Sequence, residues 1–163
     1  NRTALGLREF TLADSLSSQV EHAEAIYGGT SGSAASWDWN SLYWRDLGSP
    51  WGGVHSTGPD INRFLRYFLH PDGRVLKPES VRLMTTDQNK GLNSPYAVGF
   101  AVEPKRFGKG CSAGTFGHSG STGTLCWGDP AKDLTFVILT TLPAQVSNDL
   151  VIRPVSDRVS ELV

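Results

Sequence analysis

Residues 116–123 read Phe116-Gly117-His118-Ser119-Gly120-Ser121-Thr122-Gly123, a stretch rich in glycine and hydroxyl groups around one histidine. Two apolar runs follow, Thr124-Leu125-Cys126-Trp127 and Leu134-Thr135-Phe136-Val137-Ile138-Leu139, and residues 128–133 between them contain Gly, Asp and Pro. Turn-forming residues between β-branched and aromatic runs predict a hairpin. By composition alone, residues 116–123 are more typical of a glycine-rich turn with a solvated histidine than of a functional strand. The functional alternative is a strand whose glycines let a substrate approach the backbone, with main-chain N–H groups left to donate.

One catalytic motif that this stretch approaches is the nucleophile elbow, G-x-S-x-G. The fifth position holds Ser121 instead of glycine, and an elbow connects a strand to a helix, whereas a hairpin is predicted here. In the elbow fold the catalytic histidine also follows the serine, and no histidine follows Ser119. The elbow is therefore excluded.

The overall composition is that of one ordinary domain. The chain has 163 residues, a formal charge of −1 at pH 7 and 39% hydrophobic residues, which is enough for a real core. The small net charge argues against nucleic acid or an anionic membrane as the main partner. No apolar run approaches the ~20 residues of a membrane span. The chain has no signal peptide and does not begin with Met, so we expect a processed or excised piece.

The cysteines and histidines give little sign of disulfide or metal chemistry. Cys111 and Cys126 do not make a disulfide framework, and buried or idle thiols are expected. The four histidines are scattered without ligand spacing, which argues against a zinc site.

Residues 1–50 carry weaker patterns. A helical signal runs through 19–26, and the composition of 28–36 predicts a flexible loop. An aromatic cluster follows, made of Trp37, Trp39, Tyr43 and Trp44. Such a cluster packs against the next element or forms a wall of a substrate cleft, and the two roles are compatible.

Helix signals are clear from residue 49 onward. Thr57-Gly58-Pro59-Asp60 forms a capping box in which the Thr57 hydroxyl accepts from the Asp60 N–H and the Asp60 carboxylate reaches back. The apolar spacing after the box predicts a helix buried on one face, and residues 70–73 end it. The apolar positions of this helix are Ile61, Phe64, Leu65, Phe68 and Leu69. His55, just before the cap, is interpreted as structural.

Two shorter helices and three antiparallel strands are expected in the rest of the chain. The helices start at Pro78 and Pro154, because proline suits a first helical turn. In the first helix, Val81, Leu83 and Met84 are expected to be partly buried, and in the second, Val155, Val159 and Leu162 recur along one side. The strands are expected at 96–103, 115–128 and 133–141. The last contains an unbroken apolar run, which predicts a strand covered on both faces.

In this context, His118-Ser119-Gly120 resembles the third signature of the serine β-lactamase and penicillin-binding-protein superfamily, a Lys-Thr-Gly or His-Thr-Gly triplet that opens an edge strand of the active site. Gly117 and Gly123 fit the β-lactamase-related hydrolase and esterase branch. Three further segments resemble the same family in the same order, namely Trp51-Gly52-Gly53-Val54-His55-Ser56-Thr57-Gly58-Pro59-Asp60-Ile61-Asn62-Arg63-Phe64, Pro78-Glu79-Ser80-Val81-Arg82-Leu83-Met84-Thr85 and Tyr96-Ala97-Val98-Gly99-Phe100. The resemblance covers about 49–141 and is weak before residue 49. It implies an α/β fold with an antiparallel sheet flanked by helices.

The resemblance also implies roles for individual residues. His118 would replace the lysine as hydrogen-bonding and electrostatic partner of the catalytic centre. Ser119 would bind a substrate carboxylate or carbonyl, with Gly120 and Thr122 beside it in the substrate site. The backbone N–H of Ser121 would supply half of an oxyanion hole, since a fixed donor aimed at a developing alkoxide needs no reorganisation.

The family's nucleophile lies in Ser-x-x-Lys, where the lysine helps to deprotonate the serine. No serine here is followed at the third position by lysine, and the second signature, Tyr-x-Asn or Ser-x-Asn, is missing as well. In the family both motifs precede every segment recognised here. We therefore expect the C-terminal part of such an enzyme, with 51–163 in the α/β domain and 1–50 leading from an N-terminal half that carries the nucleophile.

The intact protein would form an acyl-enzyme on that serine and hydrolyse it with water, without a metal or organic cofactor. Its partners would be a small-molecule or peptide acyl substrate and the N-terminal half of the same protein. The substrate, whether lactam, peptide or ester, stays open. Family members are often periplasmic or secreted, and the compartment here stays unassigned. The competing interpretation is a non-catalytic module that keeps the fold as a peptide or glycan receptor or as a scaffold.

Overall fold

The structure is a computed structural model that describes residues 47–52 and 54–163. The elements are helices α3 (Gly58–Leu69) and α4 (Pro78–Thr85), the 3₁₀ turn η2 (Pro104–Arg106), strands β1 (Phe116–Gly120), β2 (Thr124–Asp129) and β3 (Leu134–Leu139), and then α5 (Ala144–Ser147), the π-helical turn η3 (Asn148–Ile152) and α6 (Arg153–Leu162). The helical signal at 19–26, the loop at 28–36 and the aromatic cluster of residues 37–44 all lie outside the described residues.

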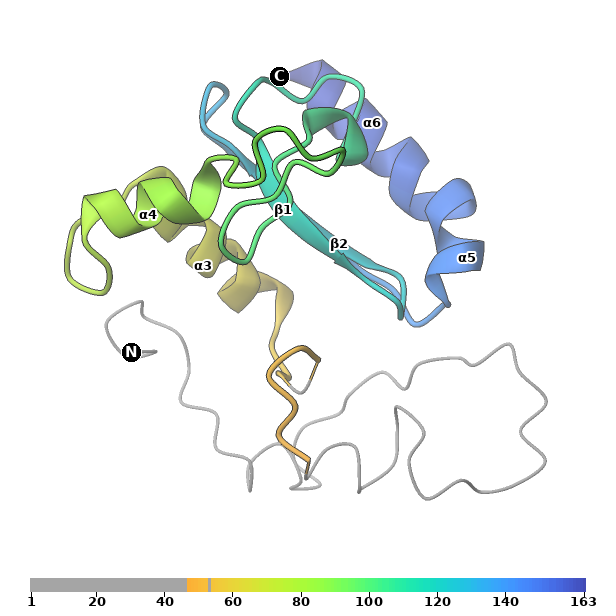
Figure 1. Ribbon diagram of the computed structural model, residues 1–163. Coiled ribbons are helices and arrows are strands. Elements are labelled where there is room, and N and C mark those ends of the chain that lie inside the picture. The colour runs from red at the N-terminus through yellow and green to blue at the C-terminus, as the bar shows by residue number, and fades with distance from the viewer. Residues whose placement is uncertain (1–46, 53) are drawn as a thin grey trace.

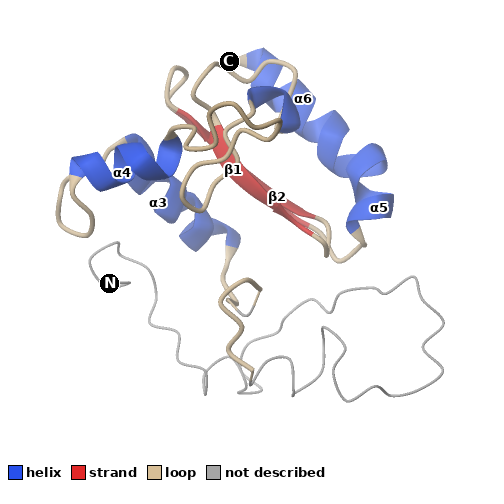
Figure 2. Ribbon diagram, in the orientation of Figure 1, coloured by secondary structure: helices blue, strands red, loops and turns tan. Residues whose placement is uncertain are grey.

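The described strands form one antiparallel sheet in the order β1-β2-β3, with helices around it, as the sequence predicts (Figure 2). Strands β2 and β3 pair from Thr124↔Leu139 to Asp129↔Leu134, which confirms the predicted hairpin. Its turn ends at Asp133, which adopts a φ of 47°. An aspartate tolerates this left-handed backbone better than most residues do.

Two of the predicted strands are wrong. The strand expected at 115–128 is two strands, because a turn closes with a hydrogen bond from the Gly123 N–H to the Gly120 carbonyl (3.1 Å). The strand expected at 96–103 is absent, and only isolated bridges remain there, Tyr96↔Ala101 and Ala101↔Gly117. Gly99 has a φ of 97° and lies in a tight turn, so this segment cannot stay extended.

The helices lie on the two faces of the sheet and enclose separate apolar clusters (Figure 1). The α3-side cluster contains Leu65, Tyr67, Phe68, Val81, Phe100 and Phe116. The α6-side cluster contains Ala101, Phe107, Leu125, Trp127, Phe136 and Ile152. Side chains alternate along each strand, so neighbouring residues of β1 and β2 contribute to different clusters. The sheet is therefore positioned by packing on both faces.

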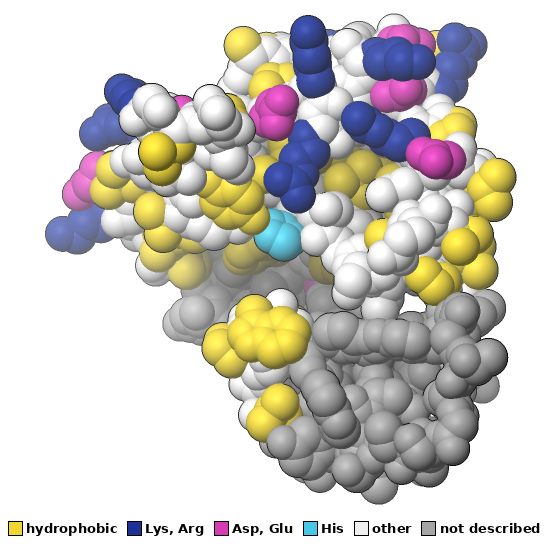
Figure 3. All heavy atoms as spheres, turned by 45° about the vertical axis from the view of Figure 1, so that its right-hand side comes forward, with side chains coloured by type: hydrophobic (Ala, Val, Ile, Leu, Met, Phe, Trp, Pro, Cys, Tyr) yellow, Lys and Arg dark blue, Asp and Glu magenta, His cyan; other side chains and the backbone are white. Residues whose placement is uncertain are grey.

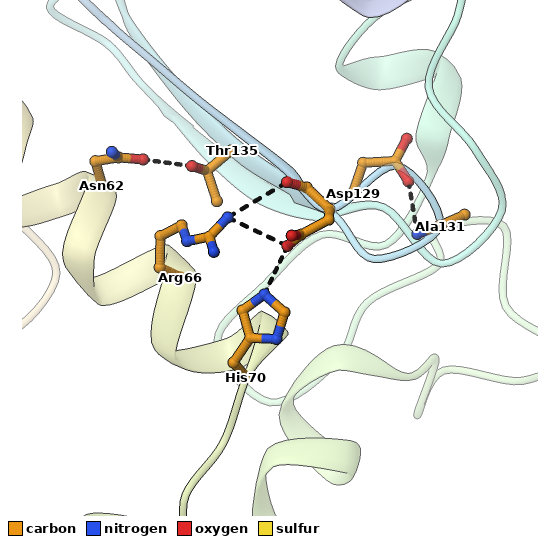
Figure 4. A network of polar contacts seen from close by, with 7 residues as sticks. Asn62, Arg66, His70, Asp129, Ala131 and Thr135 are labelled. Atoms are coloured by element: carbon orange, nitrogen blue, oxygen red, sulfur yellow. Dashed lines mark hydrogen bonds and ion pairs between the residues drawn. The ribbon is translucent and has the colours of Figure 1, made fainter. Parts of the chain in front are cut away.

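Helix α3 forms as its sequence predicts and is fastened to the β2–β3 hairpin. The Asp60 N–H donates to the Thr57 hydroxyl (3.4 Å), and the helix ends at the cap residue His70. The His70 Nε2 lies 2.6 Å from the Asp133 Oδ1, and the Arg66 Nη1 lies 3.2 Å from the same oxygen. Figure 4 shows how Arg66 of α3 and the cap residue His70 point at this turn.

Helices α4 and α6 begin near the predicted prolines, but their buried faces differ from the prediction. In α4, Val81 is buried and Met84 is half-buried, whereas Leu83 is exposed. In α6, Val155 and Leu162 are 40% and 64% exposed and Val159 is half-buried. The fully buried residues of α6 are Ser156 and Ser160.

Small side chains face inward on α6 because this helix lies against the glycine loop that follows η2. A Cβ added to Gly108 would come within 2.5 Å of the Ser160 Oγ, and one added to Gly110 would overlap the Ser160 backbone. The Ser156 Oγ accepts from the Trp127 Nε1 (2.8 Å) and donates to the Phe107 carbonyl (2.7 Å). The serine hydroxyls thus satisfy polar groups in a contact that is too close for valine.

Strand β3 is less covered than predicted. Phe136 is its one buried residue, and Leu139 is exposed. Among the described residues, no strand pairs with the outer edge of β3. Over the same residues, no helix combines the length and the hydropathy that crossing a bilayer requires.

Candidate functional site

The candidate site lies along the outer edge of β1, which the triplet His118-Ser119-Gly120 occupies. Gly117 exchanges two backbone hydrogen bonds with Ala101 across this edge, at 2.9 and 3.0 Å. In an antiparallel ladder the N–H and C=O groups of alternate residues point to the same side. The main-chain groups of Ser119 therefore point to the edge that faces away from β2.

The N–H of Ser121 also points to the outer edge of β1, because of the direction of the peptide that carries it. The Gly120 carbonyl accepts the turn hydrogen bond from Gly123. That carbonyl and the Ser121 N–H belong to one planar trans peptide, so they point in opposite directions. In the described part of the chain, the Ser121 N–H has no hydrogen-bond acceptor. It is a fixed main-chain donor at the end of an edge strand.

His118 and Ser119 lie on opposite faces of β1. His118 shares its face with Phe116 of the α3-side cluster, whereas Ser119 pairs with Leu125 of the α6-side cluster. His118 is exposed and Ser119 is half-buried. The two side chains therefore border the outer edge of β1 from its two faces.

The aromatic neighbour of His118 is Tyr96, which the sequence did not identify as a site residue. The two rings meet edge to face, with centroids 6.3 Å apart and an interplanar angle of 82°. Asp87 holds this segment, since its Oδ1 accepts from the Tyr96 N–H (3.1 Å) and the Asn89 N–H (2.9 Å). Within the described residues, the imidazole of His118 has no hydrogen-bond partner.

The glycines of this stretch serve packing, which differs from the expectation that they admit substrate. A Cβ at Gly117 would overlap the Cys126 carbonyl, and a Cβ at Gly120 would lie 2.5 Å from the Thr124 Oγ1. Gly123, with a φ of 73°, is enclosed by protein atoms of residues 140–147. The glycines therefore let β2 and the 140–147 segment approach β1 and its turn.

The thiols near the site are poor nucleophiles. Cys126 lies opposite His118 in the ladder, and burial raises the pKa of its thiol. Burial and the nearby Asp129 carboxylate raise the pKa of Cys111 to about 11. Both thiols are therefore protonated at neutral pH, and a Cys–His nucleophile is not formed here.

Within the described residues, the candidate site lacks the serine–lysine pair that the family resemblance implies. No serine hydroxyl in the described ranges is hydrogen-bonded to a lysine amine. Figure 3 shows a histidine side chain in a recess, with hydrophobic side chains beside it and Lys and Arg side chains above. Leu83 and Val98 are among the exposed apolar residues of the described part. The two residues are neighbours, because the Val98 N–H donates to the Leu83 carbonyl (3.5 Å).

Residues 140–147 contact the candidate site, and the sequence did not predict this contact. Thr140 and Ala144 both bond to the β1–β2 turn. The only local signal was Thr140-Thr141-Leu142-Pro143, a break between an apolar strand and a helix, and this pattern does not reveal what the segment contacts.

The chain matches known proteins over most of its length. The β-lactamase family model matches residues 3–155. This match begins well before residue 49, the point from which the sequence motifs resemble the family. Two curated proteins of Mycobacterium tuberculosis, the uncharacterized protein MT1414 and protein Rv1367c, are each 38% identical over 111 residues, covering 54% of this chain and 27% of theirs. This chain therefore spans only 27% of the length of these relatives.

A solved structure agrees with the family model. The crystal structure of a β-lactamase (Mb2281c) from Mycobacterium bovis has a TM-score of 0.58 and 28% sequence identity, covering 66% of this chain and 44% of that chain. The shared features are those described above, an antiparallel sheet with helices around it. On the family model and this fold, the chain belongs to the β-lactamase family.

Proposed function

We propose that this chain forms one wall of the active site of a serine acyl hydrolase of the β-lactamase, DD-peptidase and esterase type. The observation that carries the proposal is the N–H of Ser121, which points out of an edge strand and has no acceptor in the described residues. A fixed N–H of this kind stabilises negative charge that develops on a carbonyl oxygen.

In the proposed reaction the nucleophile and its base come from the N-terminal half of the same protein. The serine oxygen adds to the acyl carbon while its proton passes to the lysine, and the carbonyl oxygen becomes an oxyanion held by the Ser121 N–H. The bond to the leaving amine or alkoxide then breaks, and the leaving group takes the proton. Water hydrolyses the acyl-enzyme and restores the serine.

The side chains on the two faces of β1 take different roles in this proposal. His118, exposed and braced by Tyr96, acts as the electrostatic partner of the catalytic centre. Ser119 binds a carboxylate or carbonyl of the substrate, with Gly120 and Thr122 bordering the same place. The substrate is a small acyl compound or peptide, and no metal or organic cofactor takes part.

The proposal is tested by locating the reactive serine in the full-length protein. A fluorescent penicillin and a fluorescent fluorophosphonate are added, and the labelled peptide is identified by mass spectrometry. We expect a label on a serine of a Ser-x-x-Lys motif outside residues 1–163. A label on a serine within 1–163 would refute the assignment. No label, together with binding of a peptide or glycan, would support the non-catalytic module instead.

The isolated chain provides a second test. Without nucleophile and base we expect no turnover of lactam or ester probes, because an oxyanion donor alone leaves only residual catalysis. We also expect the isolated chain to self-associate, since the outer edge of β3 exposes unpaired N–H and C=O groups beside apolar side chains. Size-exclusion chromatography and thermal melting test the expected self-association. A monomer with one sharp melting transition would contradict it.

A further inference from the structure

The β1–β2 turn is held by a segment that lies far from it in sequence. We call residues 140–147 the turn clamp. The Thr140 N–H and the Thr140 hydroxyl both donate to the Gly123 carbonyl, at 3.0 and 2.7 Å. The Ala144 N–H donates to the Ser121 carbonyl at 2.9 Å. The clamp therefore bonds to the turn on both sides of Thr122.

These bonds fix the peptide planes of the turn. The central peptide of a β-turn, here between Ser121 and Thr122, is the one that flips most readily between turn types. The Ala144 N–H holds its carbonyl and opposes such a flip. The Gly120 carbonyl is held by the Gly123 N–H, and the Gly123 carbonyl is held in turn by Thr140. The Gly120–Ser121 peptide carries the Ser121 N–H. Its orientation is therefore fixed by Gly123 and, through Gly123, by Thr140.

The clamp also fits tightly against Gly123. A Cβ at this position would overlap the Leu142 carbonyl, the Thr140 Oγ1 and the Ser147 Oγ. Ser147 is itself fully buried, and its hydroxyl donates to the Pro143 carbonyl (3.1 Å). The Thr140 Oγ1 accepts from the Leu142 N–H (3.3 Å) as well as donating to the turn. The hydroxyl of Thr140 therefore joins the turn to the backbone that leads into α5.

We propose that Thr140, together with the Ala144 N–H, is a positioning element that aims the Ser121 N–H at the reacting carbonyl. This inference rests on the proposed function. Thr140 bonds to the turn at Gly123, so in this proposal it acts through Ser121. A donor that is preorganised costs no reorganisation when charge develops, and a donor on a loosened turn loses that advantage. The loss falls on kcat, because the oxyanion exists only after the substrate is bound.

The experiment compares three threonine variants in the full-length protein with nitrocefin and p-nitrophenyl acetate as probes. Thr140→Val keeps the shape and the backbone N–H and removes only the hydroxyl. Thr140→Ser restores the hydroxyl. The matched control is Thr135→Val in β3, the strand that precedes Thr140, and this variant loses a hydroxyl bonded to Asn62 of α3, away from the β1–β2 turn. For Thr140→Val we expect kcat to fall by roughly 10-fold, less than the ~10²–10³-fold seen when a donor is removed outright.

The controls separate positioning from a general loss of stability. KM should stay within about 2-fold, and Thr140→Ser should recover most of kcat. Thr135→Val should melt at a temperature similar to Thr140→Val but keep wild-type kcat. If Thr140→Val does not fold, Ala144→Pro provides the second variant. It removes the N–H that holds the Ser121 carbonyl, at a first helical position where proline is tolerated, and it should lower kcat in the same way.

Two different results would overturn the inference. If the wild-type protein is active and both Thr140→Val and Ala144→Pro keep the kcat of Thr135→Val, the clamp does not position the donor, and the proposed function stands. If the wild-type protein turns over neither probe and is labelled by neither a penicillin nor a fluorophosphonate, the proposed function fails, and the inference fails with it.

Discussion

Strand β2 lies between two hairpin turns that are held in different ways. The β1–β2 turn is held by main-chain and hydroxyl donors from the half-buried residues Thr140 and Ala144. The β2–β3 turn is held from inside by the buried Asp129 carboxylate, which accepts from the Ala131 N–H (3.1 Å), and from outside by the exposed contacts of Arg66 and His70 with Asp133. The first turn admits no added Cβ at Gly123, whereas the second accommodates a side chain at its left-handed residue.

The two turns therefore differ in what encloses them: a distant segment packs closely against Gly123 of the first turn, whereas the second turn is held by its own Asp129 and by exposed side chains at the end of α3. A hydrogen bond contributes about 0.5–1.5 kcal/mol, and an exposed ion pair contributes about 0–1 kcal/mol and weakens with salt. Several polar contacts converge on the β1–β2 turn, next to the strand that carries His118-Ser119-Gly120. We infer that this turn is rigid because the direction of its N–H groups matters.

The first prediction concerns the fit of Gly123. Gly123→Ala should destabilise the protein by about 2–5 kcal/mol, the sum of left-handed strain of ~1–2 kcal/mol and overlap with the clamp of ~1–3 kcal/mol. Gly114→Ala is the matched control, because Gly114 has a similar φ of 88° but open space at its Cβ. Gly114→Ala should therefore lower the free energy of unfolding only by the left-handed strain, ~1–2 kcal/mol. Urea unfolding of the full-length protein measures both, and equal values for the two variants would show that the clamp is not tight.

The second prediction concerns the donor itself. Ser121→Pro removes the N–H at a turn position where proline is accepted, so the turn should persist. We expect kcat for lactam or ester hydrolysis to fall by about 10²–10³-fold, the loss typical of one oxyanion donor. Ala113→Pro is the control, because it places proline at the same position of another turn, closed by the Thr115 N–H and the Ser112 carbonyl, and it should leave kcat unchanged. Wild-type kcat in Ser121→Pro would exclude the oxyanion role.

The third prediction distinguishes the two faces of β1. Ser119→Ala should weaken the use of carboxylate-bearing substrates by about 1–2 kcal/mol, the value of a hydrogen bond to a charged group, and should affect neutral esters less. His118→Ala should lower kcat for both substrate classes, because its proposed role is electrostatic. Measurements of kcat and KM on a lactam and on a neutral ester test this. The triplet assignment is wrong if both variants behave as wild type.

The fourth and smallest effect is expected at the β2–β3 turn. Asp133→Asn removes the charge that Arg66 and His70 contact, while asparagine tolerates the same backbone. Since the Asp133 side chain is 57% exposed, the loss should be at most about 1 kcal/mol and should shrink further in high salt. Activity should not change. A loss as large as that of Gly123→Ala would remove the contrast between the two turns.

The sequence predicted the elements whose signals are local. The capping box at Thr57 and the apolar spacing after it predicted α3, and turn residues between two apolar runs predicted the β2–β3 hairpin. The strand predicted at 115–128 covers most of β1 and β2 but misses the turn between them. The predicted strand at 96–103 failed because Gly99 closes a turn that its apolar neighbours do not reveal.

The remaining features depend on contacts between distant parts of the chain. Ser156 and Ser160 are buried because a glycine loop lies against α6, and no helical periodicity shows which loop that is. Thr140 reaches a glycine that is 17 residues earlier in the chain, and a hydroxyl at the end of a strand looks the same with or without such a partner. The role of the turn could therefore be inferred only from the fold.

The most direct test of the central claim is a crystal structure of the full-length protein inhibited by a phosphonate that forms a covalent serine adduct. We predict that the adduct forms on a serine outside residues 1–163 and that one phosphonyl oxygen accepts a hydrogen bond from the Ser121 N–H at about 2.7–3.1 Å. The Thr140 hydroxyl should remain on the Gly123 carbonyl in that complex. An adduct whose oxygens lie away from the β1 edge, with the Ser121 N–H turned toward solvent, would contradict the account.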